Sequence, residues 1–120
     1  MNAPVSYLEL NTGDLPTSTA FFTAVFGWTP QPFAAPDYLV APHGDAPGID
    51  TALLTSRDGQ PRAVPVIRVT DLEQTLAGVT THGGTVVVEP FALGGVGRGA
   101  YVTDPAGLLL GLHHYDPAAG

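Results

Sequence analysis

Hydrophobic and polar positions alternate along several short stretches of the chain, and two longer stretches have the spacing of amphipathic helices. The first alternating stretch is 5–11, with Leu8 and Leu10 on one face and Tyr7, Glu9 and Asn11 on the other. Alternation with a period of two predicts a half-buried strand. The polar residues of this strand therefore share the face opposite the two leucines.

The first helical stretch follows at once. Asp14 is a favourable N-cap residue, Pro16 fits the first turn, and Gly27 is placed to end the helix. One mainly apolar stripe runs along it, made by Leu15, Thr19, Phe22 and Phe26. We expect the phenylalanines of this helix (Phe21, Phe22 and Phe26) to belong to the core, and Trp28 to pack between helix and sheet.

The remaining alternating stretches predict three strands after the first helix, then the same order again. The first three span 29–33, 38–41 and 49–54. A further strand at 64–69 precedes a helix capped by Asp71 and ended at His82-Gly83-Gly84. The last three strands span 85–91, 99–103 and 108–114. The polar segment 55–61 between the two halves is interpreted as a linker.

The two halves repeat one topology. Asp14-Leu15 recurs as Asp71-Leu72, and thirteen residues separate Asp14 from Gly27 just as thirteen separate Asp71 from Gly84. This predicts an α+β fold built from two βαβββ modules, at about 5–56 and 62–115, within one domain over residues 1–120.

Composition and charge restrict the partners. The chain has 11 acidic residues, 4 arginines, no lysine and a formal charge of −7. We therefore expect no nucleic-acid partner and no anionic membrane surface. The absence of cysteine excludes thiolate metal sites and thiol catalysis. No apolar stretch approaches the ~20 residues that span a bilayer, and no signal segment begins the chain, so we expect a soluble cytoplasmic protein.

Three segments resemble the vicinal oxygen chelate superfamily, which includes glyoxalase I, extradiol dioxygenases, and bleomycin- and fosfomycin-resistance proteins. They are LELNTGDLPTSTAFFTAVFGW (8–28), VIRVTDLEQTLAGVTTHGGTVVVEP (66–90) and GRGAYVTDPAGLLLGL (97–112). The resemblance implies that the modules form a half-open, barrel-like sheet with the helices outside. It also implies a cavity and a homodimer.

The resemblance further implies metal ligands on the first and last strands of each module. Carried over position by position, these ligands fall on Tyr7, Pro65 and Gly111, with Asp50 the nearest acid for the fourth. Proline and glycine offer no side-chain donor, and a neutral phenol is a poor ligand for divalent metals. We therefore expect no metal and no cofactor. A displaced set made by Glu9, Asp50 and His113 is the alternative.

The residues that we expect to bind a ligand lie on or beside strands, where members of the superfamily line their cavity. They are Tyr7, Glu9, Phe33, Tyr38, Arg98, Tyr101 and His113. Tyr7 and Tyr38 would stack on or donate to the ligand, Glu9 would accept a hydrogen bond, and Arg98 or His113 would anchor an acidic group. Alternation places Arg68 on the helix side of its strand.

Three functions are consistent with these residues. The leading hypothesis is a metal-independent protein that binds a small organic molecule, like the drug-sequestering bleomycin-resistance proteins. The second is a lyase, isomerase or dioxygenase that uses Glu9, Asp50 and His113, with a displaced metal or by acid–base chemistry alone. The third is a subunit whose surface serves protein partners. No GxSxG nucleophile elbow is present, so acyl transfer is unsupported.

Overall fold

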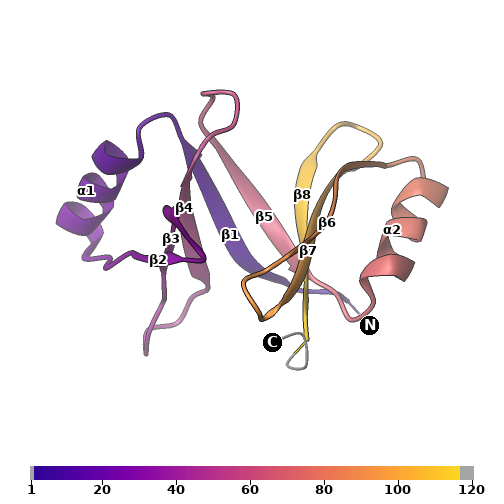
Figure 1. Cartoon of the computed structure of the whole chain (residues 1–120), viewed down its shortest axis with the longest axis horizontal. Coiled ribbons are helices and arrows are strands. Elements are labelled where there is room, and N and C mark those ends of the chain that lie inside the picture. Colours follow the sequence, from indigo (N-terminus) through magenta and orange to yellow (C-terminus); the bar gives the residue numbers. More distant parts are fainter. Residues whose placement is uncertain (1, 117–120) are drawn as a thin grey trace. The chain divides into compact units, whose positions relative to one another are not determined.

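The computed structural model describes residues 2–116 and confirms the predicted order of helices and strands. Contacts divide these residues into two compact units. We call residues 7–64 module one, and residues 65–116 with the segment before Tyr7 module two. Figure 1 follows both along the chain. The chain start belongs to module two because the backbone N–H of Arg68 donates to the Pro4 carbonyl at 2.9 Å.

Module one contains β1 (Val5–Thr12), which begins in the preceding segment, α1 (Leu15–Phe26), β2 (Gln31–Phe33), β3 (Ala35–Ala41) and β4 (Asp50–Thr55). Its strands lie in the order β2-β3-β4-β1, with β1 parallel to β4 and the other neighbours antiparallel. Asp14 caps α1 because its side chain accepts a hydrogen bond from the Thr17 backbone, and Gly27 ends the helix at a φ of 73°.

Module two repeats this plan with β5 (Arg62–Arg68), α2 (Leu72–Thr81), β6 (Thr85–Ala92), β7 (Gly97–Thr103) and β8 (Leu109–Tyr115). The order β5-β8-β7-β6 has the parallel pair in the same place. Asp71 caps α2 by accepting from the Gln74 backbone. The predicted duplication of a βαβββ unit, and with it the α+β class, is therefore confirmed.

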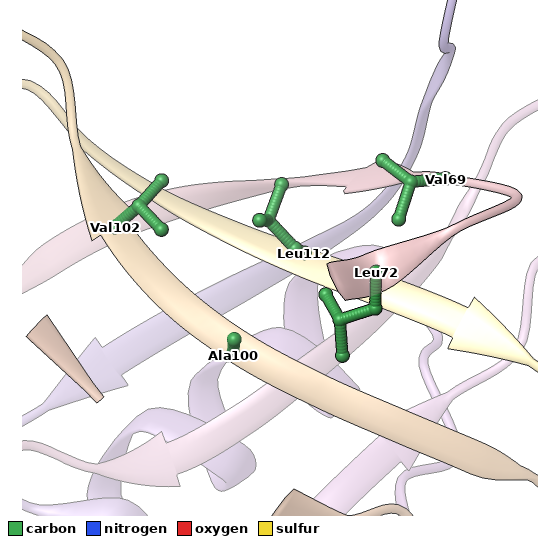
Figure 2. Close-up of a cluster of buried hydrophobic side chains, with 5 residues drawn as sticks. All are labelled: Val69, Leu72, Ala100, Val102 and Leu112. Atoms are coloured by element: carbon green, nitrogen blue, oxygen red, sulfur yellow. The ribbon is translucent and has the colours of Figure 1, made fainter. Parts of the chain in front are cut away.

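The core of module two lies under α2. Leu72, in the first turn of the helix, is 1 % exposed and packs with four residues of the sheet and its edge, as Figure 2 shows: Val69, Ala100, Val102 and Leu112. Ile67 packs against the same cluster. The residues of β5, β7 and β8 that alternate with these lie on the other face of the sheet, which we call the helix-free face of module two.

The helix of module one contributes less to a core, although Leu53 of β4 is 1 % exposed. No residue of α1 is buried, and Phe21 and Phe26 are 55 % and 59 % exposed. The expectation of a core position is therefore wrong for Phe21 and Phe26, whereas Phe22 is half-buried and its ring contacts both of theirs. The Trp28 ring stacks on Phe22, with 4.6 Å between ring centroids.

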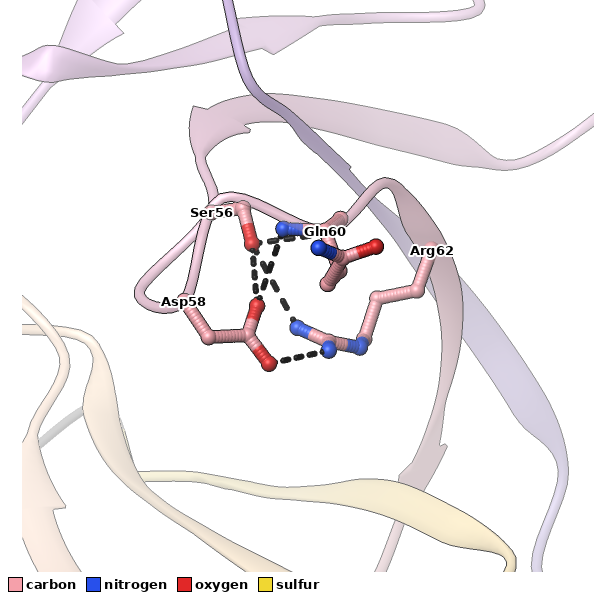
Figure 3. Close-up of polar contacts among 4 residues, drawn as sticks. All are labelled: Ser56, Asp58, Gln60 and Arg62. Atoms are coloured by element: carbon pink, nitrogen blue, oxygen red, sulfur yellow. Dashed lines mark hydrogen bonds and ion pairs between the residues drawn. The ribbon is translucent and has the colours of Figure 1, made fainter.

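The segment 55–61 is a hydrogen-bonded turn rather than a loose linker. Ser56 Oγ, in a residue only 7 % exposed, lies 2.8 Å from Asp58 Oδ1 and 2.7 Å from the Gln60 carbonyl oxygen, and Arg62 Nη2 donates to Asp58 Oδ2 at 2.6 Å (Figure 3). The hydrogen bond from Arg62 is the main reason why the pKa of Asp58 lies far below its usual range. The polar side chains of this segment therefore make hydrogen bonds within the turn itself.

Among the described residues, neither helix has the length and apolar character needed to cross a membrane.

Candidate functional site

A chain of three hydrogen-bonded side chains lies on module one. Tyr38 donates from its hydroxyl to Glu9 Oε2 at 2.7 Å, and the hydroxyl oxygens of Tyr7 and Tyr38 are 3.0 Å apart. Glu9 is only 3 % exposed, whereas both tyrosines are half-buried. The structure therefore brings together three of the residues predicted from the sequence.

The register of the strands places this chain on the face of the sheet away from α1. Thr12 bonds to Ser18 of α1, with 2.6 Å between their hydroxyl oxygens, so the even-numbered residues of β1 face the helix. Tyr7 and Glu9 alternate with them and lie on the opposite face. Glu9 is the register partner of Ala52, and both residues are buried.

Counting protons fixes the direction of each hydrogen bond. Tyr38 has one hydroxyl proton, and it is committed to Glu9. The bond between the two tyrosines must then be donated by Tyr7. Burial, and after it the negative charge of Glu9, raise the pKa of Tyr38 far above its usual value. Tyr38 therefore keeps its proton, and the chain runs from Tyr7 through Tyr38 to the carboxylate.

Two aromatic rings cover the helix-free face of module two. Phe91 and Tyr101 stack with 5.7 Å between centroids. Two glycines make room for them. A Cβ at Gly99 would lie 3.0 Å from the Phe91 ring, and one at Gly111 would lie 3.0 Å from Val66 Cγ2 and 3.4 Å from the Tyr101 ring. The space above these glycines is therefore filled by side chains of neighbouring strands.

A second cluster on the same face joins His113, Tyr115 and Arg68. Nδ1 of His113 lies 2.7 Å from the Tyr115 hydroxyl, and the Arg68 guanidinium carbon lies 4.8 Å from the centroid of the Tyr115 ring. Burial lowers the pKa of His113 to about 4, so its imidazole is neutral at pH 7. A neutral imidazole is a weak anchor for an acidic group.

Sequence reasoning misses two members of this cluster. The placement of Arg68 on the helix side of its strand is wrong: Arg68 is the register partner of His113, while Ile67 packs towards α2. Tyr115 is absent from the predicted set, although it follows His113 by two residues and so shares its face. Following the alternation of β8 one step further would find it.

Arg98 lies on the opposite face from this cluster. Its Nη2 donates to both carboxylate oxygens of Glu73 in α2, at 2.5 and 2.8 Å. It alternates with Gly97 and Gly99, and is therefore on the same side as Ala100, which packs under α2. The structure joins Arg98 to the helix and does not bring it together with Tyr101 or His113.

Phe33 also stands apart from the polar chain. It is 39 % exposed at the end of the edge strand β2, where the register shifts and Ala34 adopts a φ of 66°. Its assignment as a ligand-binding residue stays a prediction.

The positions that correspond to the metal ligands of the superfamily do not fit a metal ion. Tyr7 carries a phenol, and Gly111 lies under the Tyr101 ring. On β5 the residue that meets Gly111 is Val66, whereas Pro65 alternates with it, so the facing position holds valine. Asp50, the register partner of Tyr7, accepts a hydrogen bond from the His43 backbone at 3.1 Å. Over residues 2–116, no three His, Asp or Glu side chains gather closely enough to hold a metal.

Solved structures with the same fold include proteins of different activity. The methylmalonyl-CoA epimerase of Mycobacterium tuberculosis matches 94 % of this chain and 88 % of its own, with 15 % identity and a TM-score of 0.68. The Mn(II)-bound glyoxalase of Novosphingobium aromaticivorans matches 95 % of this chain and 40 % of its own, with 20 % identity and a TM-score of 0.68.

Curated relatives are closer in sequence and longer. The "Putative glyoxylase CFP32" of Mycobacterium bovis and that of Mycobacterium tuberculosis are each 30 % identical to this chain over 117 residues. The match covers 89 % of this chain, which spans 44 % of the length of these relatives.

A sequence profile of one family matches residues 5–112, which include both modules almost completely. The match agrees with the duplicated βαβββ order and with the Asp caps at the start of both helices. The chain belongs to the Glyoxalase/Bleomycin resistance protein/Dioxygenase superfamily.

Proposed function

We propose that this protein binds a small organic molecule without a metal ion, in the manner of the drug-sequestering members of its superfamily. The observation that carries the proposal is the replacement of metal-ligand positions by Tyr7, Val66 and Gly111. A catalytic metal needs about three protein ligands and one open position. A phenol, a valine and a glycine do not provide such a set.

Each module carries side chains of the kind that line binding sites for organic molecules. Sites for small molecules are mostly apolar or aromatic, with a few polar groups that fix the orientation of the ligand. Tyr101 and Phe91 supply aromatic surface in module two, and Tyr7, Tyr38 and Glu9 supply polar atoms in module one.

The proposal is tested by metal analysis and a ligand screen on the same purified protein. We expect less than about one tenth of an equivalent of Mn, Fe, Ni or Zn. We also expect at least one compound from a library of metabolites and antibiotics to raise the melting temperature in a saturable way, because a ligand that binds the folded state stabilises it by mass action.

A stoichiometric metal ion that is lost in Glu9→Ala, together with a metal-dependent activity, would overturn the proposal. Glu89→Ala, which removes an exposed carboxylate of β6, is the matched control. A library without any saturable ligand would instead favour a role in binding protein partners.

The second candidate is an acid–base lyase or isomerase. The buried carboxylate of Glu9, joined through Tyr38 to Tyr7, favours it, because a carboxylate in such a setting can accept a proton from a bound carbon acid. Incubating the bound compound with the protein in D2O distinguishes the two. An unchanged compound fits binding alone, whereas deuterium incorporation that is lost in Glu9→Gln fits the enzyme.

The same proposal includes a homodimer located in the cytoplasm, as the resemblance to the superfamily implies. Sedimentation velocity at several protein concentrations tests the dimer, and cell fractionation tests the location. A sedimentation coefficient of the monomer at all concentrations would contradict the first part.

A further inference from the structure

Arg68, the last residue of β5, has its positive charge next to an aromatic ring rather than an acid. Its guanidinium carbon lies 4.8 Å from the centroid of the Tyr115 ring. Within residues 2–116, the guanidinium groups of Arg62 and Arg98 each pair with a carboxylate, and that of Arg68 pairs with none. A cation–π contact uses the face of the ring and leaves N–H donors for an acceptor oxygen. Since Arg68 is exposed, a ligand can reach these donors.

The strand register places Arg68 in line with the aromatic surface of the same face. Arg68 is the register partner of His113 on β8, and His113 is the register partner of Gly99 on β7. The Phe91 ring lies over Gly99, because a Cβ there would be 3.0 Å from it. Neighbouring strands are about 4.8 Å apart, so β8 separates Arg68 from Gly99 by about 10 Å. One row across the sheet therefore begins with a cation and ends under an aromatic ring.

The middle of this row adds no charge. Burial lowers the pKa of His113 to about 4, so its imidazole is neutral at pH 7. At the far end, the Tyr101 ring stacks on the Phe91 ring and enlarges the aromatic surface. Both aromatic residues are half-buried, so part of each stays accessible. The row thus offers a cation, a neutral middle and an aromatic end, which matches the order of groups in an acid that carries a phenyl ring.

Resting on the proposed binding function, we infer that the helix-free face of module two binds small aromatic carboxylates, with Arg68 holding the carboxylate and the Phe91 and Tyr101 rings holding the aromatic group. A guanidinium can donate two parallel hydrogen bonds to one carboxylate, and these charge-assisted bonds are stronger than bonds between neutral groups. Arg68 then takes the role of anchor that the sequence suggested for Arg98 or His113. The formal charge of −7 repels anions at long range, so the selectivity has to come from contact with Arg68.

The inference is tested with two probes of the same shape, 3-phenylpropionate and its neutral amide, 3-phenylpropanamide. Their two-carbon chain lets the polar group reach Arg68 while the ring lies beside Phe91. Dissociation constants are measured by NMR titration of the native protein at pH 7 and 0.15 M NaCl. We expect the acid to bind at least fivefold more tightly than the amide. The acid should also shift the backbone amide signals of Arg68 and Gly99, because both lie in the row that it covers.

Variants of Arg68 locate the anchor. Arg68→Gln removes the charge, and we expect the acid to lose its whole preference over the amide. Arg62→Gln makes the same change of net charge at the other end of β5 and should keep the preference. Arg68→Lys keeps the charge without the paired donors, so the preference should fall at least twofold and stay above that of Arg68→Gln. If Arg68→Gln fails to fold, Arg68→Lys alone provides the test.

A variant of Phe91 locates the aromatic end. Phe91→Leu keeps an apolar side chain on β6 and removes the ring that stacks on Tyr101. We expect it to weaken the binding of both probes at least threefold and to leave the preference for the acid unchanged. The two ends of the row are thereby tested separately, since one sets the preference and the other sets the affinity for the ring.

An amide that binds as tightly as the acid would overturn the inference. So would an equal loss of preference in Arg68→Gln and Arg62→Gln, because net charge would then explain the effect. A native protein that binds compounds of the larger library but neither probe also overturns it, and leaves the proposed function standing. Failure of the proposed function is a separate result: it is a native protein with no saturable ligand at all.

Discussion

The two modules begin their helices in the same way and bury them differently. Asp14 and Asp71 each accept a hydrogen bond from a backbone N–H three residues later. Yet Leu72 of α2 is 1 % exposed, whereas Phe26 of α1 is 59 % exposed. A cap and an apolar stripe are thus sufficient to form a helix, but the depth of burial depends on the residues that the sheet provides beneath it.

The faces away from the helices differ as well. Module one carries a buried acid and two phenols joined by hydrogen bonds, and module two carries stacked rings over glycines. Both modules nevertheless keep the same strand order and the same parallel pair. The duplicated topology therefore does not require duplicated chemistry, and each face has to be tested with its own variants.

The largest expected difference between the modules concerns the helices. Leu72→Ala should lower the free energy of unfolding by about 3 kcal/mol, because it leaves a cavity in the core of module two. Phe26→Ala, at an exposed position of α1, should cost less than about 1 kcal/mol. Urea denaturation followed by circular dichroism measures both. Equal losses would show that the α1 rings are buried in solution.

The next effect belongs to module two alone and depends on pH. His113 has a pKa lowered by burial from 6.5 to about 4, so between these values the unfolded chain binds more protons than the folded one. The stabilisation is fully present above pH 6.5 and is lost as the pH falls towards 4, by up to about 3 kcal/mol. Unfolding free energies measured at several pH values test this.

Two histidine variants separate the contribution of His113 to the pH dependence of stability from the contribution of the carboxylates. His113→Gln should flatten the pH profile between 6.5 and 4, whereas His82→Gln, at the exposed end of α2, should keep the native slope. An NMR titration in which the His113 imidazole protonates near pH 6.5 would contradict the prediction.

The hydroxyl groups of Tyr38 in module one and Tyr115 in module two allow a matched comparison of two hydrogen bonds. Tyr38→Phe removes the donor to a buried carboxylate and should cost about 2 kcal/mol. Tyr115→Phe removes a bond to a neutral imidazole and should cost about 1 kcal/mol. Thermal and urea unfolding of the two variants give the comparison. A larger loss of unfolding free energy in Tyr115→Phe than in Tyr38→Phe would contradict the conclusion that the hydrogen bond to a charged group lies in module one.

The smallest change in stability is expected at corresponding positions of β4 and β8, the last strand of each module. Gly111→Ala places a methyl group 3.0 Å from Val66 Cγ2 and should cost about 1 kcal/mol, because the neighbouring side chains have to shift. Asp50→Ala, at the position facing Tyr7 in module one, should cost less, since its side chain is 45 % exposed. A stabilised Gly111→Ala would show that the space above the glycine is open.

The order of elements could be predicted from the sequence because alternation, caps and terminal glycines are local signals. They predict the strands around Leu8 and Leu10 and the helices after Asp14 and Asp71 to within a few residues. Tyr7, Glu9 and Tyr38 could also be found, since alternation gives the face of each residue. Their hydrogen bonds could not, because these depend on the register between β1, β4 and β3.

The remaining differences come from contacts between elements. Arg98 precedes a strand in a glycine-rich segment, and only the packing of α2 places Glu73 against it. The rings of α1 have the spacing of a buried stripe, but no element of module one covers them completely. Partners of this kind are set by tertiary structure, and a single sequence contains no local signal for them.

The packing of Tyr101 over Gly111 limits which substitutions position 111 can accept. A carboxylate introduced at position 111 would collide with Val66 and the Tyr101 ring. Shrinking the Tyr101 ring first would leave a hole beside Phe91. Either single step lowers the stability, so introducing an acidic residue at position 111 requires coordinated changes at several positions. Natural variation should therefore show these sites changing together.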